Sequence, residues 1–272
     1  MDHHANSYAA PDNSAAATTT ESYPHFLENL VYKYGSDKGH DDHGYTDFYQ
    51  MLFDHIRLSV RNVTEVGVSA GQGMQAFYHY FPNALIHGFD VTTAPSVSKI
   101  AQDCSDRIRF QEKDLLKVPP VSVGLQDETM DLVIDDATHM PVHQRMFITN
   151  LFRLVKPGGY YIIEDLPFAF SRGREMWRDN PESFPKGVWE ILSNHDTVLV
   201  DTHMGHRDWE TWQKRVSGGN AKNHAEHNSY LMVVRKRHTP PPPVKMSLGA
   251  RAMKSDLVLH EGENNKITST RG

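Results

Sequence analysis

The chain has 272 residues, of which 39% are hydrophobic, and its formal net charge is -6 at pH 7. This length and apolar content suffice for one folded domain with a buried core. The acidic charge disfavours nonspecific binding to nucleic acid or to an anionic membrane surface, so we expect a small-molecule partner. Cys104 is the single cysteine and no apolar run is long enough to span a membrane, so neither an internal disulfide nor a transmembrane segment is expected.

The two ends of the sequence differ from its middle. Residues 1–22 are small and polar, whereas residues 238–272 begin near a run of four prolines and then, apart from Leu257–Leu259, lose apolar periodicity. We therefore predict a disordered N-terminal tail, a folded domain over residues 23–237, and a mostly disordered C-terminal tail. Because the N-terminal stretch resembles neither a secretory nor a mitochondrial signal, we expect a cytoplasmic protein.

The polar stretch YGSDKGHDDHGYTDFY, residues 34–49, precedes the first predicted strand. Its glycines and its density of polar side chains indicate a loop that folds over a bound cofactor. Ser36, Asp37, His43 and Tyr45 are its candidate binding residues. A helix cap followed by a surface turn is the alternative interpretation.

Strand-like apolar runs then alternate with helix-like segments, which is the pattern of a parallel sheet covered by helices. Strands are predicted at residues 62–70, 85–91, 107–114, 130–136 and 160–166. Between the last two strands, we predict a helix that begins at Pro141 and is stopped by Gly158 and Gly159. The predicted fold class is therefore α/β.

All five predicted strands carry carboxylates at or near their ends. These are Glu65, Asp90, Asp114, Asp135 with Asp136, and Glu164 with Asp165. Ligands of open parallel sheets bind outside the carboxyl ends of the strands, so we expect these side chains to line one cleft. A solvated loop or a helix cap is the alternative for any one of them taken alone.

The glycines after the first strand narrow the choice of ligand. Gly67, Gly71 and Gly73 do not have the GxGxxG spacing of dinucleotide-binding proteins. Glu65 precedes them with no lysine or arginine nearby in the sequence, which favours a cationic or neutral ligand over a phosphorylated one. Asp90 is placed to bind two ribose hydroxyls, so a nucleoside without phosphate, S-adenosylmethionine, is the expected cofactor. A turn that needs a positive φ is the alternative reading of the glycines. We assign to the cofactor site Ser36, Tyr45, Glu65, Gly67, Gly71, Asp90, Asp114 and Asp135.

The motifs EVGVSAGQG, GFD, IDDATH and PGGYYIIEDL together resemble class I S-adenosylmethionine-dependent methyltransferases. With the stretch at 34–49 and with IDDATHMPVHQ, residues 30–237 resemble more narrowly the metal-dependent sugar O-methyltransferases of macrolide biosynthesis, of the mycinamicin and demethylmacrocin type. The resemblance implies a doubly wound, Rossmann-like sheet that is mostly parallel and has an antiparallel last strand, for which residues 228–236 are the candidate. It also implies magnesium bound by Asp136, Glu164 and Asp165, with His139 as the general base.

The residue types suit this chemistry independently of the resemblance. Carboxylates are the ligands that a hard cation such as magnesium prefers, and a neutral imidazole is available at physiological pH to take a proton. We therefore expect an O-methyltransferase that acts on a hydroxyl of a sugar, a glycoside or a polyol-like natural product. The alternatives are a catechol-like phenol as the acceptor, or a protein that binds S-adenosylmethionine without turnover. The sequence is also compatible with a homo-oligomer.

Several further segments carry no catalytic assignment. The chain has 17 histidines, many of them in pairs such as His3 with His4, and we expect most to face solvent rather than to bind zinc. Residues 168–192 mix aromatic residues with arginine and proline, and we predict a loop that covers the substrate or else a core segment. Residues 208–216 carry tryptophans that suit either a sugar ring or surface packing.

Overall fold

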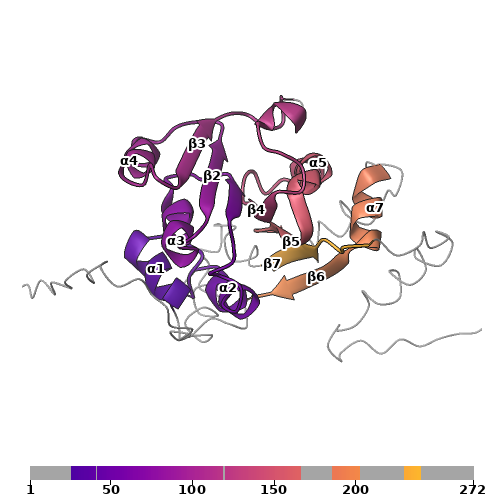
Figure 1. Ribbon diagram of the computed structural model, residues 1–272, viewed down its shortest axis with the longest axis horizontal. Helices are drawn as coiled ribbons and strands as arrows, with labels where there is room; N and C mark the ends of the chain where they lie inside the picture. The colour runs from indigo at the N-terminus through magenta and orange to yellow at the C-terminus, as the bar shows by residue number, and fades with distance from the viewer. Residues whose placement is uncertain (1–25, 41, 119, 167–185, 203–229, 240–272) are drawn as a thin grey trace, which may run out of the picture.

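The computed structural model describes residues 26–40, 42–118, 120–166, 186–202 and 230–239, and Figure 1 shows the arrangement of its elements. The helices are α1 (Phe26–Tyr34), α2 (Tyr45–Phe53), α3 (Gln72–Tyr80), α4 (Pro95–Asp103), α5 (Pro141–Leu151) and α7 (Lys186–Asn194), with 3-10 turns η1 (Pro120–Val123) and η2 (Phe152–Leu154). The strands are β1 (Asn62–Val66), β2 (Leu85–Asp90), β3 (Ile108–Glu112), β4 (Met130–Asp135), β5 (Val155–Ile163), β6 (Asp196–Asp201) and β7 (Tyr230–Arg235).

The described strands form one seven-stranded sheet in the order β3-β2-β1-β4-β5-β7-β6. β1 pairs in parallel with both β2 and β4, and the parallel pairing extends outward to β3 on one side and β5 on the other. β7 is antiparallel to both of its neighbours, β5 and β6. The chain builds the sheet outward in one direction from β1 to β3 and in the other direction from β4. Open α/β sheets bind their ligands at the carboxyl ends of the strands beside such a reversal of strand order, here between β1 and β4. The predicted α/β class, with a mostly parallel sheet and an antiparallel last strand, is confirmed.

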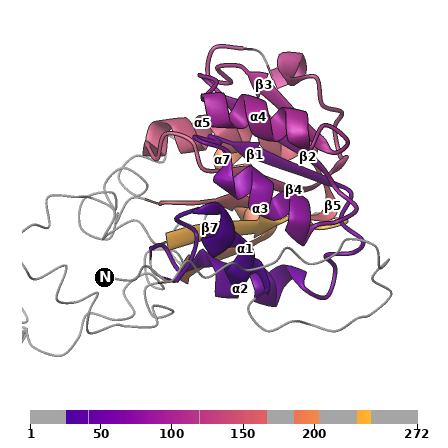
Figure 2. The same ribbon diagram turned by 90° about the vertical axis from the view of Figure 1, so that its left-hand side faces the viewer.

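Helices cover both faces of the sheet (Figure 2). On one face, α1, α3 and α4 pack over the sheet and α2 packs on α1, around a core that includes Leu27, Tyr49 and Phe77. On the other face, α5 and α7 pack together over a second core that includes Phe147 and Leu192. The central strand β4 is buried along its whole length, because each face of a doubly covered sheet is removed from water, whereas the edge strand β6 is mostly exposed.

The predicted helix after β4 begins at Pro141, as expected, but the position predicted for its end is wrong. α5 ends at Leu151, and the backbone carbonyls of Arg153 and Leu154 instead accept hydrogen bonds from residues 128 and 129. Val155 then pairs with Met130, so Gly158 and Gly159 lie within β5 rather than at a helix end. Sheet pairing across the chain, which the local sequence does not show, decides this boundary.

The two predicted tails lie outside the described residues, except for 238 and 239, and so do the predicted loop at 168–185 and the tryptophan-containing stretch 208–216. The domain limits 23–237 therefore stay a prediction. Among the described helices, none combines the length and the apolar content needed to cross a membrane.

Candidate functional site

A cavity of about 370 Å³ opens at the carboxyl ends of β1, β2 and β4. Its walls come from residues 35–38 before α2, the turn between β1 and α3, the end of β2, and the segments that follow β4 and β5. This volume lies within the range of small-molecule sites, roughly 300–1,000 Å³. The cavity therefore lies at the edge of the sheet where the sequence predicts a ligand cleft.

Gly67 allows the ends of β1 and β4 to approach each other beside this cavity. Its φ is +85°, and a Cβ at this position would overlap the carbonyl oxygen of Asp136 and the Cα of Ala137. Only glycine fits such a close approach. Gly71 also has a positive φ, as the N-cap of α3, but it packs toward α4 and does not line the cavity. Of these two predicted cofactor residues, the structure places only Gly67 at the cavity.

Asp90 lies at the end of β2 with its carboxylate held by two backbone groups. Oδ2 accepts a hydrogen bond from the N–H of Ser69 at 3.0 Å, and Oδ1 accepts one from the N–H of Thr92 at 3.2 Å. These bonds fix the side chain at the wall of the cavity. Each carboxylate oxygen has a second lone pair, so Asp90 retains the capacity to bind two hydroxyl groups.

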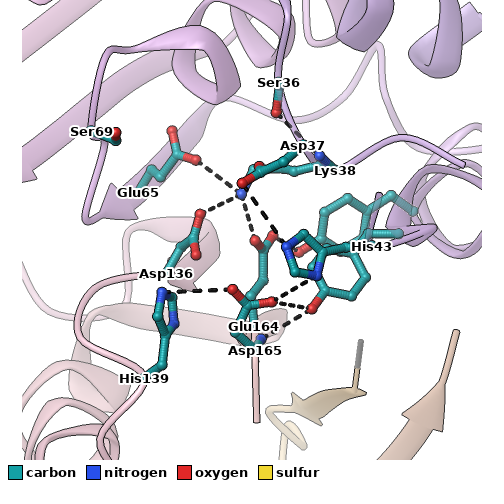
Figure 3. A network of polar contacts seen from close by, with 12 residues as sticks. Ser36, Asp37, Lys38, His43, Glu65, Ser69, Asp136, His139, Glu164 and Asp165 are labelled. Carbon is teal, nitrogen blue, oxygen red and sulfur yellow. Dashed lines mark hydrogen bonds and ion pairs between the residues drawn. The ribbon is translucent and has the colours of Figure 1, made fainter. Parts of the chain in front are cut away.

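Lys38 occupies the centre of the carboxylate cluster, and our sequence reading did not identify it (Figure 3). Its Nζ donates to Asp136 Oδ2 at 2.6 Å and to Glu164 Oε2 at 2.5 Å, and it lies 3.5 Å from Glu65 Oε1. The lysine side chain is only 3% exposed. Although no lysine or arginine is close to Glu65 in the sequence, Lys38 reaches it in space from the loop before α2.

Burial disfavours the charged forms of the carboxyl groups in this cluster. Burial raises the pKa of Glu65 to about 7, although the Lys38 ammonium acts in the opposite direction. Burial also raises the pKa of Asp136 and of Glu164, again against Lys38. Burial alone would lower the pKa of Lys38, but Asp136, Glu164 and Glu65 together raise it well above its usual range. One ammonium thus faces several buried carboxylates, and a further cation would stabilise them.

Asp136, His139 and Asp165 form a group that could hold a metal ion, since one ligand atom from each lies within 4.8 Å of the others. His139 Nε2 is 3.6 Å from Asp165 Oδ2 (Figure 3). Glu164, the third carboxylate that the resemblance assigns to magnesium, is not part of this group, and its two oxygens accept hydrogen bonds from Lys38 and from the Tyr49 hydroxyl. The structure therefore brings together three of the four residues predicted for metal and base.

Tyr45 at the start of helix α2, and His43 just before the helix, hold Asp165 of the metal group in place. The Tyr45 hydroxyl donates to Asp165 Oδ1 at 2.5 Å and accepts the N–H of the same residue at 3.1 Å. His43 stacks on the Tyr45 ring and places its Nδ1 3.3 Å from Asp165 Oδ1. Tyr45 is fully buried and does not line the cavity, so it positions Asp165 rather than meeting a cofactor as predicted. Ser36, from the same loop, does line the cavity.

Asp114 and Asp135, both predicted to bind the cofactor, do not line the cavity. Asp114 forms an ion pair with Lys117 at 2.7 Å on the surface, and the hydrogen bond from that lysine lowers its pKa. Asp135 points to the opposite side of β4 from Asp136, since successive strand residues alternate between faces. Burial raises its pKa well above the usual range, and Tyr161 lies beside it.

Two histidines of the loop before α2 are buried and are exceptions to the expected exposure to solvent. His40 is 2% exposed and pairs with Glu28 and Asp47. His43 is 8% exposed and faces Asp165. The pairs at residues 3–4 and 224–227 lie outside the described residues.

Comparison with known proteins places this geometry in context. Residues 64–163 match the methyltransferase domain family. A rhamnosyl tetracenomycin-C 2'-O-methyltransferase of Streptomyces olivaceus is 30% identical over 53% of this chain and 38% of its own length. The demethylmacrocin O-methyltransferase of Streptomyces fradiae is 28% identical over 62% of this chain and 44% of its own length. The chain thus spans less than half the length of these curated relatives.

The structure also resembles that of MycE, a methyltransferase from the mycinamycin biosynthetic pathway solved in complex with Mg, SAH and mycinamycin VI. The TM-score is 0.53 at 20% sequence identity, over 80% of this chain and 57% of that one, which establishes a shared fold. With the sequence matches, it confirms the predicted resemblance to class I S-adenosylmethionine-dependent methyltransferases of the macrolide-sugar type.

Proposed function

We propose that this chain, which carries a methyltransferase domain, is an S-adenosylmethionine-dependent and magnesium-dependent O-methyltransferase, and that it methylates a hydroxyl of a sugar, a glycoside or a polyol-like natural product. The observation that carries the proposal is the group of Asp136, His139 and Asp165, which borders the same cavity as Asp90. The names of the curated relatives, which include a rhamnosyl 2'-O-methyltransferase, support the acceptor class.

The residues of the cavity suit S-adenosylmethionine, which supplies a methyl group activated on a sulfonium. Asp90 would accept hydrogen bonds from the two ribose hydroxyls. Gly67, which also lines the cavity, has no side chain that would project into the space beside the cofactor. The buried carboxylates of Glu65 and Asp136 favour a cationic reacting group over a phosphorylated one.

The donor set also suits magnesium. Asp136 and Asp165 supply carboxylate oxygens, which are the donors that a hard divalent cation prefers. Burial raises the pKa of Asp136, which means that its charged form is costly there, and a bound cation would stabilise that form. When bound, magnesium would draw electron density from the acceptor hydroxyl and make it more acidic. Glu164 as a third ligand remains a prediction from the resemblance.

His139 is the residue that we expect to take the acceptor's proton. Its Nε2 faces the metal group and the cavity, so the proton would be received at that atom. Asp165, held in turn by Tyr45, then stabilises the imidazolium that forms. Removal of the hydroxyl proton by His139 would leave the acceptor oxygen as a nucleophile, and S-adenosylmethionine, when bound, would supply the methyl group and leave as S-adenosylhomocysteine.

The test is an assay with isotopically labelled S-adenosylmethionine and a panel of glycosides, flavonoids and catechols, run with magnesium and with excess chelator. Label transfer to a glycoside that chelator abolishes is the expected result. Transfer only to catechols would favour the phenolic acceptor instead, and cofactor binding without transfer to any acceptor would favour the non-catalytic alternative. Full activity in chelator would contradict the proposed metal dependence.

A further inference from the structure

The backbone that follows β5 carries two of the carboxylates assigned to magnesium, and neighbouring strands hold it on both sides. The N–H of Glu164 donates to the carbonyl oxygen of Asp135 on β4 at 2.9 Å, and the N–H of Leu166 donates to that of Tyr230 on β7 at 3.1 Å. These are backbone bonds, which do not depend on the identity of the side chains. The peptide group between Glu164 and Asp165 lies between them and is held differently.

Two side chains contact this peptide group from opposite faces of the sheet. Gln144, on α5, donates from Nε2 to the carbonyl oxygen of Glu164 at 3.2 Å. Tyr45, at the start of α2, accepts the N–H of Asp165 at its hydroxyl oxygen at 3.1 Å and donates to Asp165 Oδ1. The apolar residues of α5 pack in one core and Tyr45 packs in the other, so the carbonyl and the N–H of one peptide group are held from both sides.

The orientation of this peptide group affects the direction of both flanking carboxylates. A peptide bond is planar, so its orientation depends on ψ of Glu164 and φ of Asp165, the torsions on either side of it. The φ of Asp165 is 48°, in the left-handed region that residues other than glycine rarely adopt and that persists where the surroundings enforce it. Because Gln144 and Tyr45 both bond to the peptide group, they stabilise this conformation.

Gln144 is buried, with 1% of its surface exposed, and it does not line the cavity. A carbonyl oxygen needs a donor opposite it, so the contact with Glu164 fixes which way the amide of Gln144 points. Oε1 is then left without a hydrogen-bond partner among the described residues. A buried amide with an unpaired oxygen contributes little to stability. What distinguishes Gln144 from an apolar residue of similar size is the hydrogen bond that it donates to Glu164.

We propose that Gln144 is a positioning residue for the metal site, because with Tyr45 it fixes the peptide group between Glu164 and Asp165 and thereby sets the direction of the carboxylates on either side. The proposal rests on the metal site put forward under the proposed function and adds a residue that is not itself a ligand. It also gives a role to the last residue of the motif IDDATHMPVHQ, to which the sequence alone assigned none.

The first test is calorimetric titration of Mg²⁺ into metal-stripped protein, without cofactor or acceptor. Gln144→Met is similar in size but has no donor, and it should bind Mg²⁺ about tenfold more weakly than wild type, as expected when a group that orients metal ligands is removed. The control is Thr149→Val, which removes a hydroxyl that bonds within the same helix and should change the affinity by less than about twofold. Equal Mg²⁺ affinity in Gln144→Met and wild type would overturn the proposal.

The affinity for S-adenosylmethionine separates positioning of the metal ligands from a general effect on the fold. Gln144 does not line the cavity, so in chelator Gln144→Met should bind the cofactor within about twofold of wild type. Equal losses of Mg²⁺ and cofactor affinity would show a general distortion and would overturn the assignment. Gln144→Asn keeps the amide on a shorter side chain, so it should lose the bond to Glu164 and show the same selective loss, and it provides the test if Gln144→Met does not fold.

A double-mutant cycle with Tyr45→Phe tests the joint action on the peptide group and needs no metal. Once either bond is lost the peptide group can rotate, and the other bond is weakened as well. In urea unfolding with chelator, the unfolding equilibrium constant of the double variant should therefore change by at least about threefold less than the product of the two single changes. Single changes that simply multiply would overturn the joint action of Gln144 and Tyr45.

These outcomes are separable from failure of the proposed function. If wild type binds Mg²⁺ and Gln144→Met binds it equally well, the role of Gln144 is overturned and the proposed metal dependence stands. Absence of Mg²⁺ binding in both proteins overturns the metal dependence and the role of Gln144 in metal binding together, whereas a coupled cycle in chelator would still support the fixing of the peptide group.

Discussion

Ser69, His139 and Asp165 all have a positive φ, and all three line the cavity. For residues other than glycine this conformation is strained, and it persists where the surrounding structure enforces it. Asp165 is held by Tyr45 and His43, and Ser69 by Asp90. The strain is therefore concentrated where the proposed chemistry takes place, which agrees with a site selected for the direction of its side chains.

The proposed base can be tested by His139→Asn, because asparagine tolerates the left-handed conformation that His139 adopts, with a φ of 54°. Turnover should fall by roughly 10²- to 10⁴-fold, which is the usual contribution of a positioned general base, and the loss should be smaller at alkaline pH. Calorimetry should show unchanged binding of S-adenosylmethionine. The matched control is His143→Asn on α5, which should keep its activity, and a normal rate in His139→Asn would remove His139 from catalysis.

Asp90 and Asp114 provide a paired test of the cofactor site, since each lies at or just after the end of a strand but only Asp90 borders the cavity. Asp90→Ala should weaken S-adenosylmethionine binding by about 1.5 to 3 kcal/mol, the contribution of hydrogen bonds to a charged group. Asp114→Ala should leave the affinity unchanged. Calorimetric titration measures both, and equal effects of the two substitutions would show that the cavity is not the cofactor site.

At the scale of elements, α2 lies before the matched methyltransferase domain yet completes the site through Tyr45 and Tyr49. Tyr45→Phe removes the hydroxyl that bonds twice to Asp165 and should lower the free energy of unfolding by about 1 to 3 kcal/mol. Mg²⁺ affinity should fall as well, since Asp165 is less firmly held. The control, Tyr78→Phe, removes an exposed hydroxyl bonded to Asp106 and should change the free energy of unfolding by less than about 0.5 kcal/mol. Urea unfolding that gives equal losses for the two variants would contradict this role of α2.

Some boundaries of the helices and strands could be predicted from the sequence alone, and others could not. The positions of the strands could be predicted because apolar runs, turn residues and the helix start at Pro141 are local signals. The true end of α5 could not be predicted, because pairing of Val155 with Met130 determines it. The role of Lys38 in the site could not be predicted from the sequence for a similar reason. Its position opposite Glu65 and Glu164 depends on how the loop before α2 folds over the sheet.

One signal for Lys38 was nonetheless present in the sequence. Carboxylates at the ends of neighbouring parallel strands repel one another when buried together, so such a cluster requires a cation from elsewhere. SDKG, residues 36–39, carries the lysine in a polar loop that was already assigned to the site. A search for the missing counter-charge would have selected it. Asp114 and Asp135 do not line the cavity, because a position at a strand end does not specify the direction of the side chain.

For the whole molecule, the buried carboxylates make stability depend on pH in the direction opposite to that of surface acids. Burial raises the pKa of Glu65 to about 7 in the folded protein, above its ordinary value of 4.5. Between these two values the folded state binds more protons than the unfolded state does. The free energy of unfolding must therefore fall as the pH rises through this window.

Glu65→Gln isolates this contribution, because glutamine does not titrate and has nearly the same shape. In chelator and without cofactor, the free energy of unfolding of the variant relative to wild type should rise between pH 4.5 and pH 8 by on the order of 3 kcal/mol. Urea unfolding at several pH values measures it, with the exposed Glu112→Gln as a control that should follow the wild-type curve. Parallel curves for wild type and Glu65→Gln would mean that Glu65 titrates alike in both states. In that case the ammonium of Lys38 already offsets the cost of burying the Glu65 carboxylate, and that carboxylate would need no further cation.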